Sequence, residues 1–163
     1  MKEANPVRKA LLALEPSEGC WLTLASPAAA EAMAHCGFDW LVVDMEHAPN
    51  DVASLTAQLQ AIDAARAHGA AAHPVVRVTV NDAALVKRAM DCGARTVIFP
   101  NIDTAEDARR AIASMRFPSE GNGGVRGVAG LVRAGMYGQD PTYVKLANEQ
   151  ACAILQIESA QAV

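Results

Sequence analysis

The stretch GFDWLVVDMEHAPN, from Gly37 to Asn50, carries the clearest fold signal in the chain. Residues 39–45 at its centre form a short apolar run, as is typical of a strand buried in a parallel sheet. Asn50 or Asp51 is expected to cap a helix that runs to about residue 66, because short polar side chains accept hydrogen bonds from the first free N–H groups of a helix. The stretch therefore predicts a strand, a polar loop and a helix in succession.

The same unit recurs along the chain. We expect strands near residues 21–25, 40–46, 74–79, 96–100, 125–129 and 152–158, and helices over about 6–15, 27–37, 51–66 and 82–91 and from about residues 104 and 140 onward. Alternating strands and helices predict a parallel α/β sheet, which can be an open doubly wound sheet or a barrel. Strands that recur about every 28 residues favour the barrel, but a TIM-type (β/α)₈ barrel needs roughly 250 residues. We therefore expect residues 1–163 to form a single partial barrel domain with about six of eight strands, truncated on its C-terminal side.

The composition excludes several classes of protein. The chain has 163 residues, of which 52% are hydrophobic and 20% charged, so it can form a sizeable core. The net charge is −4 and the basic residues are scattered, which argues against a nucleic-acid partner. The four cysteines form no CxxC pair, so reduced thiols and a cytoplasmic location are expected. The N-terminal apolar run is too short to span a membrane.

Polar residues gather at the predicted C-terminal strand ends, where barrel enzymes place their catalytic groups. They are Asp44, Glu46, His47, Arg77, Asn101, Gln156 and Glu158. Gln156 and Glu158 are expected to share a face, because strand side chains alternate with period two. Each residue also has a structural interpretation: the Asp44–His47 group as a polar loop, Arg77 as part of an ion pair, and Glu158 as a solvated side chain. Asp91 lies at a helix C-terminus, where its charge opposes the helix dipole, and needs a compensating partner.

These motifs resemble the HpcH/HpaI aldolase family, whose type member is 4-hydroxy-2-oxoheptanedioate aldolase of aromatic compound catabolism. The similarity covers essentially the whole chain. It rests on GFDWLVVDMEHAPN at 37–50, PVVR at 74–77 followed by Asn81-Asp82, Asp91 with Gly93, GVRGV at 124–128 and LQIE at 155–158. The resemblance implies a barrel of the phosphoenolpyruvate/pyruvate-binding kind. For the full-length parent it implies a homo-oligomer, a hexamer.

The resemblance also implies roles for the matched residues. His47 would be the catalytic base, Arg77 would bind pyruvate, and Gln156 would contact the substrate. Glu158 would ligate a divalent metal, Mg²⁺, Mn²⁺ or Co²⁺, with Asp44 and Glu46 supporting the metal's waters and the histidine. Asp91 would raise the basicity of the histidine, although the predicted topology places it at the other end of the barrel. The family's second metal ligand, an Asp in a Gly-Pro-Ala-Asp-like loop after the seventh strand, has no counterpart in this sequence.

Three functions follow from these observations. The first is a metal-dependent aldolase that cleaves a 4-hydroxy-2-oxo acid, such as 4-hydroxy-2-oxoheptanedioate, reversibly to pyruvate and an aldehyde. A Schiff-base mechanism is disfavoured, because no lysine falls at a predicted strand end. The second is a carbon–carbon lyase acting on acyl-CoA substrates, as citrate and malyl-CoA lyases do, although no basic cluster for the CoA phosphates is visible. The third is an inactive fragment or an interaction module of the same fold.

Overall fold

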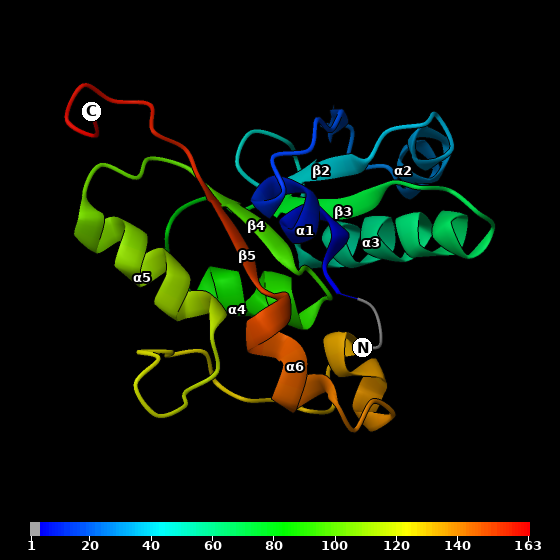
Figure 1. Cartoon of the computed structure of the whole chain (residues 1–163). Coiled ribbons are helices and arrows are strands. Elements are labelled where there is room, and N and C mark those ends of the chain that lie inside the picture. Colours follow the sequence, from blue (N-terminus) through cyan, green and yellow to red (C-terminus); the bar gives the residue numbers. More distant parts are fainter. Residues whose placement is uncertain (1–3) are drawn as a thin grey trace.

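The computed structural model describes residues 4–163 and consists of alternating strands and helices (Figure 1). In chain order the elements are α1 (Pro6–Leu12), β1 (Gly19–Leu22), α2 (Pro27–Ala34), β2 (Trp40–Asp44), α3 (Val52–Ala67), β3 (His73–Arg77), α4 (Ala83–Asp91), β4 (Thr96–Phe99), α5 (Ala105–Met115), the 3₁₀ helix η1 (Arg133–Gly138), α6 (Tyr143–Gln150) and β5 (Cys152–Leu155).

All five strands pair in parallel in one sheet, in the order β1-β2-β3-β4-β5. β2 lies between β1 and β3 and the two edges are β1 and β5, as the barrel prediction requires. The register places Asp44 beside Arg77 at the C-terminal ends of β2 and β3. The α/β fold is thus confirmed as an incomplete barrel of the TIM type.

The predicted strand at 125–129 is wrong, so the described part of the chain has five strands rather than six. The backbone N–H groups of Val125 and Arg126 donate to the carbonyls of Ala113 and Arg116, at 3.0 and 2.9 Å. The glycine-rich segment therefore follows the C-terminal end of α5 and pairs with no strand. The strands predicted near 74–79 and 152–158 also end earlier, at Arg77 and Leu155, and the first strand begins earlier, at Gly19.

The sheet has two differently covered faces. Helices α2 to α5 pack on one face over a large apolar cluster that includes Leu41, Val43, Val76 and Phe99. On the other face Val7 of α1 packs against a smaller apolar cluster, the side chains of Val42, Val75 and Ile98. Side chains alternate between the faces along each strand, so Asp44 and Arg77 lie on the α1 face, two residues beyond Val42 and Val75. Helix α1 lies over part of this face (Figure 1).

Helix starts follow the predicted capping in two cases. Asp51 and Ser54 form a capping box that begins α3, and Thr104 and Asp107 form another that begins α5. The helix predicted from about residue 140 begins three residues later, at Tyr143. The carboxylate of Asp140 accepts hydrogen bonds from the backbone N–H and hydroxyl of Thr142, the residue before α6.

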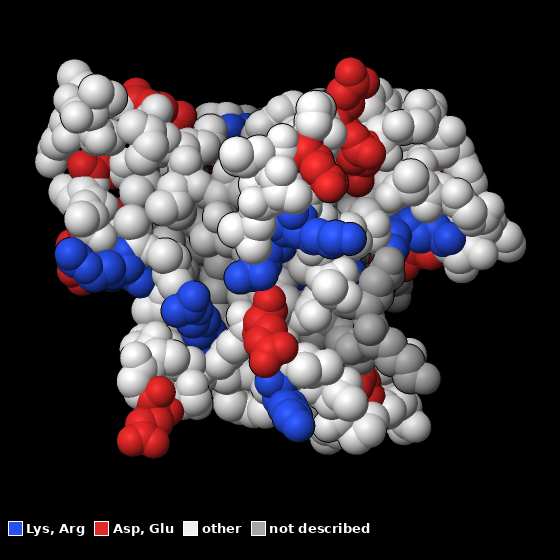
Figure 2. Space-filling model, in the orientation of Figure 1, with Lys and Arg blue, Asp and Glu red and all other residues white. Residues whose placement is uncertain are grey.

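The surface in Figure 2 carries acidic and basic side chains interspersed with one another. Within residues 4–163, no helix has both the length and the apolar character needed to cross a membrane.

Candidate active site

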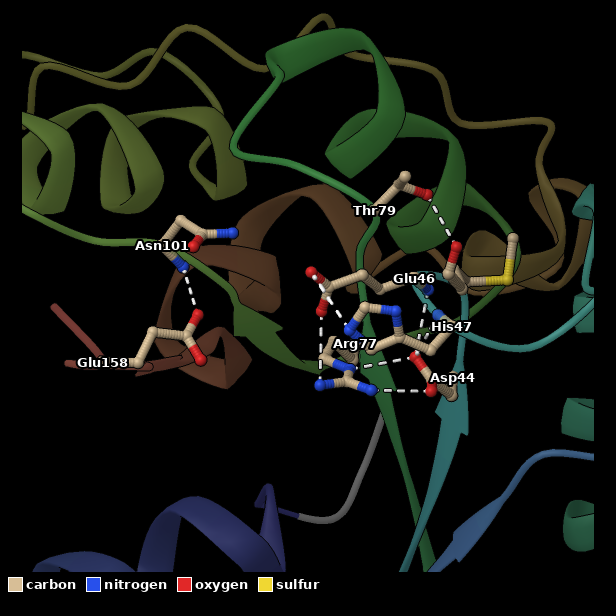
Figure 3. Close-up of polar contacts among 8 residues, drawn as sticks. Asp44, Glu46, His47, Arg77, Thr79, Asn101 and Glu158 are labelled. Carbon is tan, nitrogen blue, oxygen red and sulfur yellow. Dashed lines mark hydrogen bonds and ion pairs between the residues drawn. The ribbon is translucent and has the colours of Figure 1, made fainter.

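Asp44 and Arg77 form a buried ion pair at the carboxyl ends of β2 and β3. The guanidinium donates from Nε to Asp44 Oδ1 at 2.9 Å and from Nη2 to Oδ2 at 2.7 Å (Figure 3). The side chains are only 2% and 13% exposed, respectively. A paired fork of this kind fixes the plane of the guanidinium as well as its position.

Asp44 also shapes the loop that follows β2. Its Oδ1 accepts the backbone N–H groups of Glu46 at 3.0 Å and His47 at 3.3 Å, and its carbonyl accepts Nδ2 of Asn50 at 2.8 Å. Burial would raise the pKa of Asp44, but the hydrogen bonds from Arg77 and from the two backbone N–H groups outweigh it, so the pKa lies below its ordinary value. Asp44 is therefore a fixed negative charge that orders both the arginine and the histidine loop.

Arg77 is held on further sides. Its Nη1 lies 3.2 Å from Glu46 Oε2, and its guanidinium lies over the ring of Trp21 at 4.3 Å from the centroid. The hydrogen bond to Asp44 raises the pKa of Arg77, against the effect of burial, and the charges of Asp44, Glu46 and Glu158 add to the increase. The sequence analysis did not identify Trp21. The alternation of β1 would have indicated it, because the register sets Trp21 beside Val42, which faces α1.

His47 lies on the exposed side of this cluster. Its side chain is 70% exposed, and its Nε2 is 3.6 Å from Oε1 of Glu46. The ring is therefore open to a ligand that approaches from the solvent. Four predicted residues, Asp44, Glu46, His47 and Arg77, are therefore brought together. Asp44 Oδ1 accepts the backbone N–H of His47, and the carboxylate of Glu46 lies near its ring.

Gln156 and Glu158 lie beyond the end of β5. We predicted that they share one face of a strand, but the strand ends at Leu155, so the alternation of strand side chains does not apply to them. Oε1 of Gln156 is buried and has no hydrogen-bond partner among the described residues. Glu158 is exposed, and its Oε1 accepts the backbone N–H of Asn101 at 2.8 Å (Figure 3). Glu158 nevertheless lies close enough to Arg77 for its charge to act on the guanidinium.

Asp91 lies away from these residues. It ends α4, and α4 returns the chain to the N-terminal end of the sheet, where β4 begins. The expected compensating partner is Arg126, whose Nη2 lies 2.7 Å from Asp91 Oδ1 and equally near the hydroxyl of Tyr143. A cavity of about 510 Å³ lined by Arg126 and Tyr143 opens at this end. It lies at the opposite end of the strands from Asp44 and Arg77. The volume of a cavity therefore does not by itself identify the candidate active site.

The three carboxylates of this rim, Asp44, Glu46 and Glu158, differ in what they contact. Residues 4–163 contain no group of three or more His, Cys, Asp or Glu side chains placed to hold a metal ion. Asp44 and Glu46 both pair with Arg77, whereas Glu158 accepts a single backbone N–H and keeps its other oxygen free. A carboxylate oxygen is the ligand type that Mg²⁺ and Mn²⁺ prefer, so Glu158 fits one position of an incomplete ligand set.

The model of the HpcH/HpaI aldolase/citrate lyase family matches residues 17–163, and the chain belongs to this family.

Individual relatives are similar to the chain over nearly its whole length. The chain is 52% identical over 158 residues to a hydroxypyruvate/pyruvate aldolase of Paraburkholderia phytofirmans, covering 96% of this chain and 60% of the relative. It is 44% identical over 155 residues to a 5-keto-4-deoxy-D-glucarate aldolase of Salmonella paratyphi A, covering 95% and 57%. The crystal structure of a family member from Burkholderia cenocepacia matches with a TM-score of 0.93 and 48% identity, covering 98% of this chain and 62% of that one. The chain thus spans about 60% of the length of these relatives.

Proposed function

We propose that the protein is a class II aldolase that cleaves a 4-hydroxy-2-oxo acid reversibly to a 2-oxo acid, such as pyruvate, and an aldehyde. The observation that carries this proposal is the arrangement of Arg77. Its guanidinium is fixed by Asp44, Glu46 and Trp21 on a rim that also bears His47 and Glu158.

Arg77 supplies fixed positive charge for the 2-oxo acid. Nε and one N–H of Nη2 are taken by Asp44, which leaves other N–H groups of the terminal nitrogens to bind a carboxylate or an enolate oxygen. Because the ion pair holds the guanidinium before the substrate arrives, little reorganisation is needed as negative charge develops. The unpaired Oε1 of Gln156 is a further polar contact for the substrate.

His47 acts as the base in this proposal. In the cleavage direction its imidazole removes the proton of the 4-hydroxyl group, the C3–C4 bond breaks, and the electron pair passes into the enolate of the 2-oxo acid. In the reverse direction the imidazolium returns the proton to the new alkoxide. The exposure of the side chain lets it reach a bound substrate.

A divalent cation, Mg²⁺, Mn²⁺ or Co²⁺, would be held by Glu158, and when bound it supplies Lewis-acid stabilisation of the 2-oxo acid oxygens. Further ligands would have to come from the substrate, water or residues beyond the described set.

The names of the relatives support pyruvate or hydroxypyruvate as the 2-oxo acid. We propose 4-hydroxy-2-oxoheptanedioate as one candidate substrate.

We also propose that the protein acts as a homo-oligomer, with a hexamer as the form that the resemblance implies. The segment between α5 and α6 exposes the apolar side chains of Val125, Val128, Leu131, Met136 and Tyr137. A neighbouring copy would also give Asp91 a means to act on a histidine that its own chain places at the other end of the sheet. Light scattering coupled to size-exclusion chromatography tests this proposal, and a monomer at micromolar concentration contradicts it.

The activity is tested by exchange of the methyl protons of pyruvate in D₂O, followed by NMR with Mn²⁺ replaced by Mg²⁺ to keep lines sharp. This reaction needs the base and the enolate site but no particular aldehyde. We expect exchange that depends on the metal and is lost in Arg77→Met, with Arg109→Met as the control on an exposed arginine. Pyruvate binding without exchange would favour the alternative, a binding module of the same fold.

A further inference from the structure

The segment that follows β4 holds the carboxylate of Glu158 in place. We infer that Asp103 and Ser159 are positioning residues for Glu158 and that the backbone N–H of Asn101 is its direct contact. This inference rests on the proposed function, in which Glu158 is a metal ligand.

The backbone provides the first part of the evidence. The N–H of Gln156 donates to the carbonyl of Phe99 at 2.9 Å, and the N–H of Ile102 donates to the carbonyl of Gln156 at 3.2 Å. Ile102 is 2% exposed and belongs to the apolar core, so it anchors the segment. The pairing of β4 and β5 thus continues past the ends of both strands, up to two residues before Glu158.

Asn101 turns the chain between these two bonds. Its φ is +52°, in the left-handed region that non-glycine residues seldom adopt. This conformation aims its N–H at Oε1 of Glu158, at 2.8 Å, from a residue 57 positions away in sequence. Unfavourable backbone conformations persist where surrounding contacts impose them, and they gather at functional sites.

Ser159 fixes the other side of Glu158. Its hydroxyl donates to Oδ1 of Asp103, and both residues are partly buried. Hydrogen bonds therefore hold the chain on both sides of Glu158. Before it, the backbone of Gln156 bonds to Phe99 and Ile102, and after it the hydroxyl of Ser159 bonds to Asp103. Figure 3 shows the result, with the glutamate side chain turned toward Asn101.

This arrangement has a consequence for metal binding. An exposed glutamate ordinarily loses considerable rotamer freedom when it binds an ion. Here one oxygen is already fixed by a hydrogen bond and the other is free, so part of that ordering is complete before the ion arrives. Outer partners that orient a ligand in this way typically change metal affinity by about 10–100-fold when they are removed.

The test compares Ser159→Ala and Asp103→Asn with the wild type. Asp140→Asn is the matched control, because Asp140 also accepts a hydroxyl hydrogen bond, from Thr142, but in the segment that precedes α6. Hydrogen exchange of the Asn101 amide, measured by NMR without metal, reports the position of Glu158, with Glu158→Ala as the fully released reference. Electron paramagnetic resonance of free Mn²⁺ gives the dissociation constant.

We expect Ser159→Ala and Asp103→Asn to speed Asn101 exchange toward the Glu158→Ala rate and to weaken Mn²⁺ binding by about tenfold or more. Ser159→Thr, which keeps the hydroxyl, should restore both properties, and Asp140→Asn should change neither. Unchanged Asn101 exchange in both variants overturns the inference, whatever the metal does. If the wild type itself binds no Mn²⁺, the metal part of the proposed function fails, and the amide exchange alone decides whether Asp103 and Ser159 position Glu158.

Discussion

Removing one partner of the ion pair between Asp44 and Arg77 should destabilise the fold, because it leaves the other charge buried without compensation, and Asp44→Asn tests this. The substitution keeps the shape of the side chain but removes its charge, and it turns an amide NH₂ group toward a guanidinium that is only 13% exposed. Breaking a buried pair by removing one partner typically costs about 3–5 kcal/mol. We expect about 3 kcal/mol, the low end of that range, because Glu46 and the ring of Trp21 still contact the arginine.

Urea unfolding followed by far-ultraviolet circular dichroism measures the loss. Its pH dependence is a second test, because the pKa of Asp44 is lower in the folded state than in the unfolded chain. A depressed pKa contributes stability above the unfolded value, about 3.9, and this contribution disappears as the pH falls through the lower folded value. The difference between wild type and variant should therefore be complete at pH 7 and shrink below about pH 4.

Two controls separate the pair from general effects of mutation. The triple variant Asp44→Asn, Glu46→Gln and Arg77→Met removes all three charges of the cluster and should recover part of the lost stability. Glu106→Gln removes one partner of an ion pair whose side chains are 65% and 71% exposed, and it should change stability little. A loss below about 0.5 kcal/mol in Asp44→Asn, or a difference that does not depend on pH between 3 and 7, would refute the reasoning.

Three further predictions concern the site and the fold. His47→Asn should slow pyruvate proton exchange by roughly 10²–10⁴-fold with nearly unchanged Mn²⁺ affinity. Glu158→Ala should instead weaken Mn²⁺ binding and recover activity in excess metal. Equal loss of metal affinity in both variants would show that the base and the metal ligand are misassigned. Gly19→Ala should lower the thermal midpoint, because the added methyl group would lie 2.1 Å from the ring of Trp40, and an unchanged midpoint would mean that the ring moves aside freely. Thr104→Ala should cost about 1 kcal/mol in urea unfolding through loss of the α5 cap, with Thr104→Ser as the control that keeps the hydroxyl.

The sequence by itself determined the features that depend on neighbouring residues. Apolar runs predicted all five strands, with boundaries off by a few residues. The boxes at Asp51 and Thr104 start helices because their bonds close within three residues. The group Asp44–His47 was predictable as a rim feature, because the end of a buried strand and the following loop are local properties. The strand predicted at 125–129 does not form, because the backbone of this segment bonds to the end of α5. The local sequence does not specify this contact.

The tertiary structure alone decided how the distant groups meet. Asp44 and Arg77 are 33 residues apart, and the register of β2 and β3 makes them a pair on the face that α1 only partly covers. The contact of Trp21 with the guanidinium and the bond of Asn101 to Glu158 likewise join separate strands, and Asp91 is bound to Arg126 at the other end of the sheet. The periodicity of a sequence specifies the face of a strand on which a side chain lies. The pairing and curvature of the strands specify which other residues it contacts. The candidate chemistry of this protein depends on those contacts.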